Sequence, residues 1–249
     1  LKYNSIFKLV ITKMKRFAVY GIRRSGNHAF TEWLLKNCSA TDTRCIIKHS
    51  MVFSGNSCYL NDITGPNSIT AQLRIDHMFA CSTFQNIIVT YEDRPTNHIT
   101  EFSLGYPRIV ILRDIRNVAA SRYKRFLDKA GGASWEKYMR MDENFFKCWL
   151  EHSYANRKNN ITAVKFEDWV CDKEYRDRIA NKLALKNIDS TKTVSHHGGG
   201  SSFDHDNTNP PPLEELNERW KKIELPEAIK RRINSDDIQQ ARAHLGYKE

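Results

Sequence analysis

The chain has 249 residues, of which 40% are hydrophobic and 11% aromatic, which is enough for one sizeable core and excludes wholesale disorder. Its 39 Lys and Arg residues outnumber its 29 Asp and Glu residues, and the formal net charge of +10 favours anionic partners: nucleotides, phosphorylated or sulfated substrates, nucleic acid or acidic membranes. No apolar run approaches the roughly 18–20 residues that span a bilayer, and the apolar stretch at the start is too short for a signal peptide, so we expect a cytoplasmic protein.

Short apolar or β-branched runs alternate with helical patterns along the chain. Strands are predicted at 16–21, 44–48, 86–91, 108–112 and 161–166. Helices are predicted at 26–38, 115–129, 134–157 and 172–186, followed by two or three short helices within 213–245. The apolar run Ile109-Val-Ile-Leu112 is typical of a strand buried on both faces of a parallel sheet. This alternation predicts an α/β fold with three α/β/α layers around a central parallel sheet, like that of P-loop NTPases.

We expect one domain over residues 14–249, preceded by an N-terminal extension at 1–13 and ending in a C-terminal helical tail at 213–249. The segment 195–212 is rich in His, Gly, Ser, Asn and Pro and reads as a long loop. Loops of that length in a compact domain are usually either functional or disordered. Ligands of such sheets bind at the carboxyl ends of the strands, so polar residues at those ends are the candidates for function.

The first strand runs into Gly21-Ile-Arg-Arg-Ser-Gly26-Asn27-His28, which has the frame G-x-x-x-x-G of a phosphate-binding loop. The glycines allow backbone N–H groups to converge on an anion, the following helix adds its positive end, and Arg23 and Arg24 supply charge. Asn27 and His28 replace the usual Lys and Ser/Thr, and the missing hydroxyl is the group that holds Mg²⁺. A metal-bound triphosphate is therefore a poor fit, and an ordinary βα turn with two glycines is the alternative interpretation.

A second buried strand ends in Arg113 and leads through Asp114 into a helix. Asp114 is expected to cap that helix. Ser121 lies eight positions after Arg113, about two helical turns, so its hydroxyl can face back towards the guanidinium. An arginine and a hydroxyl that converge in this way suit a phosphate monoester. The alternative is an Arg-Asp pair with a serine that contacts no ligand.

The chain resembles the sulfotransferases that use 3′-phosphoadenosine 5′-phosphosulfate (PAPS). The resemblance rests on four pieces that follow the family's order over roughly residues 16–203. They are the loop Gly21–His28, the strand and helix Ile111-Leu-Arg-Asp-Ile-Arg-Asn-Val-Ala-Ala-Ser-Arg-Tyr123, the strand end Val164-Lys-Phe-Glu-Asp-Trp169, and the glycine-bearing segment Gly198-Gly-Gly-Ser-Ser-Phe203.

The resemblance implies roles for individual residues. Arg24 takes the place of the family's loop lysine, which contacts the 5′-phosphosulfate and stabilises the departing bridge oxygen. The other implied cofactor contacts are Arg23, Ser25, Gly26, Asn27 and His28 in the cradle, Arg113 and Ser121 at the 3′-phosphate, and Gly199, Gly200 and Ser201 in the late loop.

The base that deprotonates the acceptor has two candidates. His49 follows the predicted strand 44–48, and many relatives carry a catalytic histidine near this place, often after Lys-Thr; here Lys48 directly precedes it. Glu92 ends the strand 86–91, and some relatives use a carboxylate. The structural alternatives are a surface or supporting histidine at position 49 and a salt bridge between Glu92 and Arg94.

The sequence thus predicts an enzyme that moves a sulfuryl group from PAPS to a hydroxyl or amine of a small molecule or glycan and releases adenosine 3′,5′-bisphosphate. The six cysteines show no C-x-x-C pair and no metal-ligand spacing, so we expect mostly buried free thiols in a reducing compartment and no metal.

Two other functions remain open. One is a P-loop kinase or NTPase; the other is a nucleic-acid-binding module, suggested by the net charge and the cluster Arg122–Arg125, although no nucleic-acid-reading motif is found and no nucleic acid is expected.

Overall fold

The computed structural model describes residues 15–38, 44–47, 51–54, 57–61, 86–97, 105–129, 135–158, 160–186 and 213–247. The predicted extension 1–13 and the predicted loop 195–212 lie outside these residues. Every statement below about the fold refers to the described part of the chain.

Seven strands form one sheet in the order β2-β3-β4-β5-β1-β6-β7. Their bounds are β1 Lys15–Gly21, β2 Arg44–Ile47, β3 Met51–Ser54, β4 Ser57–Asn61, β5 Asn86–Glu92, β6 Arg108–Leu112 and β7 Ile161–Lys165. The neighbouring strands β4, β5, β1, β6 and β7 are parallel to one another, whereas β3 runs antiparallel to both of its neighbours, β2 and β4. The predicted parallel sheet is therefore confirmed at its centre, and the short strands β3 and β4 add an edge that the sequence analysis did not predict.

Both faces of the central strands are buried, as the continuous apolar runs predicted. Side chains alternate along β1, so Phe17 and Val19 enter one core and Ala18 and Tyr20 enter the opposite one. On the first face lie helices α1 (Asn27–Cys38), α5 (Phe166–Cys171) and α6 (Lys173–Lys182). The arrangement is the predicted three-layer α/β/α fold.

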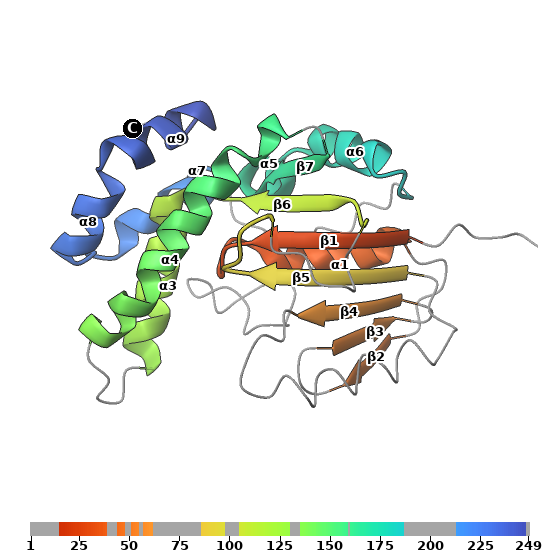
Figure 1. Ribbon diagram of the computed structural model, residues 1–249, viewed down its shortest axis with the longest axis horizontal. Helices are drawn as coiled ribbons and strands as arrows, with labels where there is room; N and C mark the ends of the chain where they lie inside the picture. Colours follow the sequence, from red (N-terminus) through yellow and green to blue (C-terminus); the bar gives the residue numbers. More distant parts are fainter. Residues whose placement is uncertain are drawn as a thin grey trace, which may run out of the picture.

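A third core joins the helices at the carboxyl ends of the strands. These helices are α3 (Ile115–Lys129), α4 (Trp135–Ser153), α8 (Glu227–Ile233) and α9 (Asp236–His244). In Figure 1 the arrowheads of the central strands point towards α3 and α4, with α8 and α9 beyond them. Trp149 of α4 is nearly fully buried in this core, and its indole N–H donates to the carbonyl oxygen of Arg113 at 2.9 Å. The helical layer is thus fixed directly to the end of β6.

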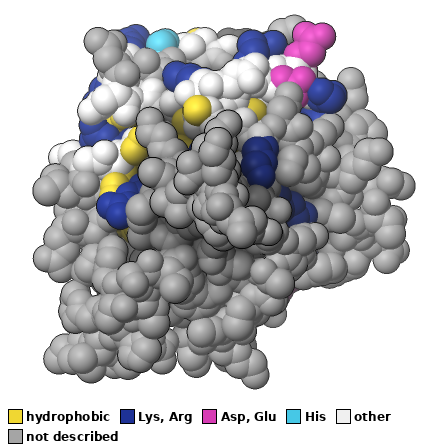
Figure 2. All heavy atoms as spheres, turned by 90° about the vertical axis from the view of Figure 1, so that its right-hand side faces the viewer, with side chains coloured by type: hydrophobic (Ala, Val, Ile, Leu, Met, Phe, Trp, Pro, Cys, Tyr) yellow, Lys and Arg dark blue, Asp and Glu magenta, His cyan; other side chains and the backbone are white. Residues whose placement is uncertain are grey.

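The opposite side of the molecule, where the central strands begin, is the face seen in Figure 2. Over its described part, Lys and Arg side chains are interspersed with hydrophobic and uncharged ones. The positive charge on the described part of this face is therefore distributed rather than gathered into one block.

The C-terminal tail consists of α7 (Leu213–Glu218), the 3-10 helix η4 (Arg219–Lys222), α8 and α9. Its first three helices pack on α3, and α9 packs on α4. Asn117 of α3 is fully buried, and its side chain hydrogen-bonds to the tail backbone before and after Arg219. Its Nδ2 donates to the carbonyl oxygen of Asn217 at 3.2 Å, and its Oδ1 accepts from the N–H of Trp220 at 3.1 Å. The tail is therefore held to the fold by a buried side chain that satisfies two backbone groups.

We predict that Asn117→Ala lowers the free energy of unfolding by about 1–3 kcal/mol, because two tail backbone groups lose their buried partner. Urea unfolding followed by circular dichroism measures the change. The exposed Asn181→Ala on α6 is the matched control and should stay within about 0.5 kcal/mol of the wild type. Equal stability of the two variants would show that Asn117 does not hold the tail.

Candidate functional site

The loop Gly21–His28 turns sharply from β1 into α1 through two residues with positive φ. Arg24 has φ 78° and Gly26 has φ 94°. The N–H of Ser25 donates to the carbonyl oxygen of Ile22 at 2.9 Å, and the N–H of Phe30 donates to that of Gly26 at 3.1 Å, where the helix begins. The first N–H groups of α1 have no acceptor within the helix, so the loop presents donors and the positive end of a helix at the carboxyl edge of the sheet.

Buried side chains hold the loop in this shape. Ser25 Oγ donates to Asn27 Oδ1 at 2.8 Å, and Asn27 Nδ2 donates to the carbonyl oxygen of Ile22 and to Glu92 Oε1, both at 3.2 Å. Ser25 and Asn27 are 1% and 3% exposed. These side chains hydrogen-bond to the loop itself and to Glu92, so an anion there would be met chiefly by backbone N–H groups and arginines.

Close packing requires both glycines of the G-x-x-x-x-G frame. A Cβ atom on Gly26 would lie 2.0 Å from the ring of Phe166, the first residue of α5. A Cβ atom on Gly21 would lie 1.9 Å from Asn27 Oδ1. Contacts with neighbouring side chains, as well as the turn itself, therefore require glycine at the two ends of the G-x-x-x-x-G frame.

The end of β5 lies directly beside the loop, because Gly21 pairs with Glu92 in the register of β1 and β5. Glu92 Oε2 is 3.4 Å from Arg23 Nε, and Glu92 Oε1 is 3.8 Å from His28 Nε2. The next residue, Asp93, accepts from the N–H of Arg23 at 2.9 Å and from Arg122 Nη1 at 3.0 Å. Two carboxylates at this strand end therefore position the loop and bring α3 to it.

Arg113 brings the end of β6 into contact with the same loop. Its Nη1 donates to the carbonyl oxygen of Arg24 at 3.0 Å, and its guanidinium lies 5.1 Å from the ring centre of Phe166. Its Nε atom is buried without a hydrogen-bond partner, 3.9 Å from Glu167 Oε1. Burial lowers the pKa of Arg113, and the charge of Glu167 opposes that effect. The site therefore contains a buried cation with an unused donor.

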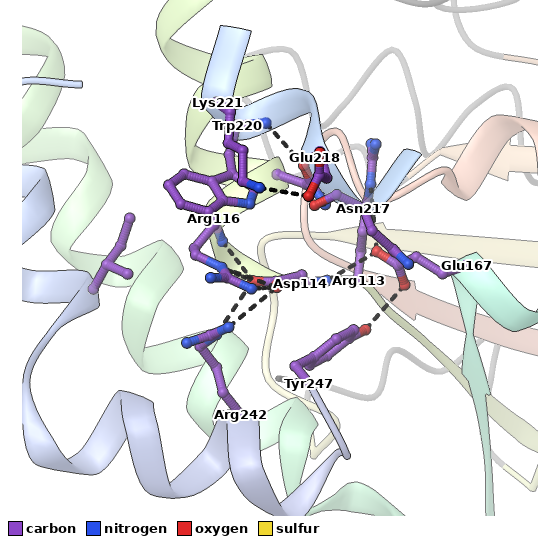
Figure 3. Close-up of polar contacts among 12 residues, drawn as sticks. Arg113, Asp114, Arg116, Glu167, Asn217, Glu218, Trp220, Lys221, Arg242 and Tyr247 are labelled. Carbon is purple, nitrogen blue, oxygen red and sulfur yellow. Dashed lines mark hydrogen bonds and ion pairs between the residues drawn. The ribbon is translucent and has the colours of Figure 1, made fainter. Parts of the chain in front are cut away.

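Figure 3 shows how Asp114 and Glu167 connect Arg113 to the tail. The predicted cap is confirmed, since Asp114 Oδ1 accepts from the N–H of Arg116 at 2.9 Å. Glu167 is 1% exposed and accepts from the N–H of Asp114 at 3.2 Å and from the Tyr247 hydroxyl at 3.0 Å. Burial raises the pKa of Glu167. The tail thus contributes Tyr247 directly to the surroundings of Arg113.

The structure gathers most of the predicted residues at the carboxyl ends of β1, β5 and β6. Ser121 lies on α3 and is 4% exposed. His49, Gly199, Gly200 and Ser201 lie outside the described residues. The sequence analysis did not assign Asp93 and Glu167 to the site, although both follow strand ends, and nothing in the sequence indicated the partners that the tail provides.

Two further findings concern the described residues. They contain no group of three His, Cys, Asp or Glu side chains that could hold a metal ion. They also contain no helix long and apolar enough to cross a membrane.

Two solved sulfotransferase structures match this chain over most of its length. The mouse sulfotransferase SULT7A1 complexed with PAP matches 94% of this chain over 90% of its own length, with a TM-score of 0.54 and 12% sequence identity. The sulfotransferase domain from the curacin biosynthetic pathway matches 94% of this chain over 98% of its own length, with a TM-score of 0.50 and 11% identity. The chain has the sulfotransferase fold.

The likeness lies in the fold and not in an overall sequence match. No protein-family model matches the chain, and no curated protein matches it. At 11–12% identity the two solved structures establish the architecture, which the four sequence pieces had predicted.

We predict that Gly26→Ala destabilises the protein far more than Gly105→Ala. Both glycines have positive φ, 94° and 80°, so each substitution carries the strain of a left-handed backbone, about 1–2 kcal/mol. Only at Gly26 does the new methyl group clash with a ring, which adds roughly 1–3 kcal/mol, whereas nothing lies within 4 Å of the Gly105 position.

Urea unfolding of the two variants measures the difference. A Phe166→Leu background should recover part of the Gly26→Ala loss, because it removes the clashing ring atoms. Equal losses at the two glycines would mean that Phe166 does not confine the loop.

Proposed function

We propose that this protein is a sulfotransferase that uses PAPS and modifies a hydroxyl or amine of a small molecule or glycan. The observation that carries the proposal is the meeting of three strand ends at one loop: the anion-binding turn after β1, Arg113 after β6 and Glu92 after β5. Cations and N–H donors are concentrated there with a carboxylate at the edge. That set suits transfer of an anionic group to an acceptor that must lose a proton.

The residues present fit the two anionic groups of the nucleotide. PAPS supplies an activated sulfuryl group at its 5′ end and a separate phosphate at its 3′ end. The 5′ end would be held by the backbone N–H groups of Gly26, Asn27 and His28 and by the guanidinium groups of Arg23 and Arg24. The buried Arg113, whose Nε has no hydrogen-bond partner, suits the 3′-phosphate. Ser121, Gly199, Gly200 and Ser201 are proposed to complete that contact.

Glu92 is the better candidate for the base. It touches the loop through Arg23, Asn27 and His28, next to where the reacting group would be held. His49 lies outside the described residues. The contacts of Glu92 with the loop therefore support Glu92 as the base.

In the proposed reaction Glu92 takes the proton from the acceptor hydroxyl or amine. The acceptor atom gains a bond to sulfur as the bond between sulfur and the 5′-phosphate oxygen breaks. Arg24 and the loop N–H groups stabilise the negative charge that this oxygen receives. Adenosine 3′,5′-bisphosphate and the sulfated acceptor are the products, and no metal is required for charge balance.

A cytoplasmic location is part of this proposal. Among the described residues Cys38, Cys148 and Cys171 are free thiols. Burial raises the pKa of Cys38 to about 12 and that of Cys148 to about 11, which keeps both protonated and unreactive at neutral pH. Inert buried thiols are typical of proteins in a reducing compartment.

Binding of adenosine 3′,5′-bisphosphate tests the nucleotide site. We expect calorimetric titration to give a dissociation constant of about 1 μM, equal in Mg²⁺ and in EDTA, since the loop lacks a metal-holding hydroxyl. Arg113→Met should weaken binding by about 30-fold, because a charged hydrogen bond to phosphate contributes roughly 2 kcal/mol.

The exposed Arg178→Met on α6 is the matched control and should bind like the wild type. Ser121→Ala provides a second test if Arg113→Met does not fold. Mg²⁺-dependent binding of ATP in place of the bisphosphate would reject the proposal and favour a P-loop kinase, and salt-sensitive binding of polynucleotides alone would favour the nucleic-acid module.

Turnover of PAPS with an acceptor found by screening tests the base. Glu92→Gln should keep bisphosphate binding within about threefold yet lower turnover by about 10²–10⁴-fold, because the amide cannot take a proton. His49→Gln is the matched comparison and should retain activity. The reverse pattern, with His49→Gln inactive and Glu92→Gln active, would assign the base to His49.

A further inference from the structure

The C-terminal end of α9 holds Tyr247 in a defined position. Gly246 follows the helix with φ 72°, its N–H donates to the carbonyl oxygen of Ala243, and the N–H of Tyr247 donates to that of Arg242, both at 3.0 Å. These two bonds form a Schellman motif, which fixes the direction in which the chain leaves the helix. Because Arg242 of the same helix lies 3.4 Å from the buried Asp114, Tyr247 is held close to the end of β6.

The hydroxyl of Tyr247 points inward to a buried carboxylate (Figure 3). It donates to Glu167 Oε2 at 3.0 Å, while Glu167 Oε1 accepts from the N–H of Asp114 at 3.2 Å. The ring of Tyr247 is fixed from another side by Lys165, whose Nζ lies 4.5 Å from the ring centre. Burial and, after it, the charges of Glu167 and Asp114 raise the pKa of Tyr247 well above its usual value. The hydroxyl therefore keeps its proton and remains a donor at neutral pH.

Glu167 lies next to Arg113 without a hydrogen bond to it. The distance from Glu167 Oε1 to Arg113 Nε is 3.9 Å, which exceeds hydrogen-bond length. The Nε atom is buried without a hydrogen-bond partner, and the guanidinium donates instead through Nη1 to the carbonyl oxygen of Arg24. Each oxygen of Glu167 already has a donor, the N–H of Asp114 for one and the Tyr247 hydroxyl for the other. The Arg113 donor thus stays unused although a carboxylate is beside it.

The Tyr247 hydroxyl decides whether this donor stays unused. Without it, Glu167 Oε2 would be a buried carboxylate oxygen that has lost its donor, which is costly. A turn of the carboxyl group towards Arg113 would satisfy that oxygen with a charged hydrogen bond. Glu167 would then occupy the donor that an incoming phosphate needs, so the carboxylate and the phosphate would compete for one guanidinium.

We propose that Tyr247 is a positioning residue that holds the Glu167 carboxylate away from Arg113 and so keeps the Arg113 guanidinium available to the nucleotide 3′-phosphate. The inference rests on the proposed function. It gives the C-terminal tail a part in nucleotide binding without any contact between Tyr247 and the nucleotide. The effect is specific to nucleotides that carry a 3′-phosphate, because the 5′ end is bound by the loop after β1.

The test compares adenosine 3′,5′-bisphosphate with adenosine 5′-monophosphate, which lacks the 3′-phosphate. Tyr247→Phe removes the hydroxyl and keeps the ring; we expect it to weaken binding of the bisphosphate by about 10-fold and to leave the affinity for the monophosphate unchanged. In a Glu167→Gln background, where no carboxylate competes, Tyr247→Phe should change neither affinity. Calorimetric titration of the full chain measures all four proteins. A tyrosine that only supported the fold would give no such rescue.

Tyr175→Phe is the matched control. The Tyr175 hydroxyl accepts from the N–H of Lys165 at 2.9 Å, so the substitution also removes one tyrosine hydrogen bond at the end of β7. Among the hydrogen bonds of the described residues, that of Tyr175 does not involve Glu167. The ratio of the two nucleotide affinities in Tyr175→Phe should therefore equal that of the wild type.

An unchanged affinity ratio in folded Tyr247→Phe, or an equal loss in the Glu167→Gln background, overturns this inference alone. If Tyr247→Phe does not fold, Glu167→Gln by itself provides the test. It should bind the bisphosphate at least as tightly as the wild type, whereas weaker binding would show that the carboxylate assists Arg113 and would overturn the inference. Failure of the wild type to bind the bisphosphate overturns the proposed function as well.

Discussion

The burial of Arg113 is the constraint on which the site depends. A guanidinium cannot lose its charge at neutral pH, so the fold must surround it with compensating groups. The carbonyl oxygen of Arg24, the ring of Phe166 and the carboxylate of Glu167 do so, the first from the loop and the other two from α5. The positions of the end of β6, the loop and α5 are therefore linked through one side chain.

Phe166 extends this link to the backbone of the loop. The same ring that lies against Arg113 occupies the space where Gly26 would carry a Cβ atom. The sharp turn before α1 and the placement of the buried cation thus depend on one aromatic side chain. Because the loop donors and Arg113 are fixed together, the two elements proposed to bind anions keep a constant separation, as a ligand with two phosphate-like groups would require.

Sequence patterns predicted those strands, helices and turns that interactions between residues near in sequence determine. The glycine frame and the apolar run before Arg113 placed the loop, β1 and β6 to within a residue or two, because close turns and continuous apolar strands leave direct signals. The six-residue helix α5 and the short strands β3 and β4 gave no comparable signal. Tyr247 was also missed, since its partner Glu167 lies 80 positions away and periodicity carries no information on such contacts.

The charged side chains of the tail fall into two groups. On its outer side cations pair with carboxylates, as in Lys222 with Glu215 and Arg232 with Asp237, and such exposed pairs stabilise a protein only slightly. On its inner side the buried Arg242 lies 3.4 Å from Asp114, the carboxylate that also caps α3. Loss of one partner from a buried pair leaves an uncompensated charge inside the protein and costs far more than loss of an exposed pair. The inner pair therefore does more than the outer ones to hold the tail at the end of β6.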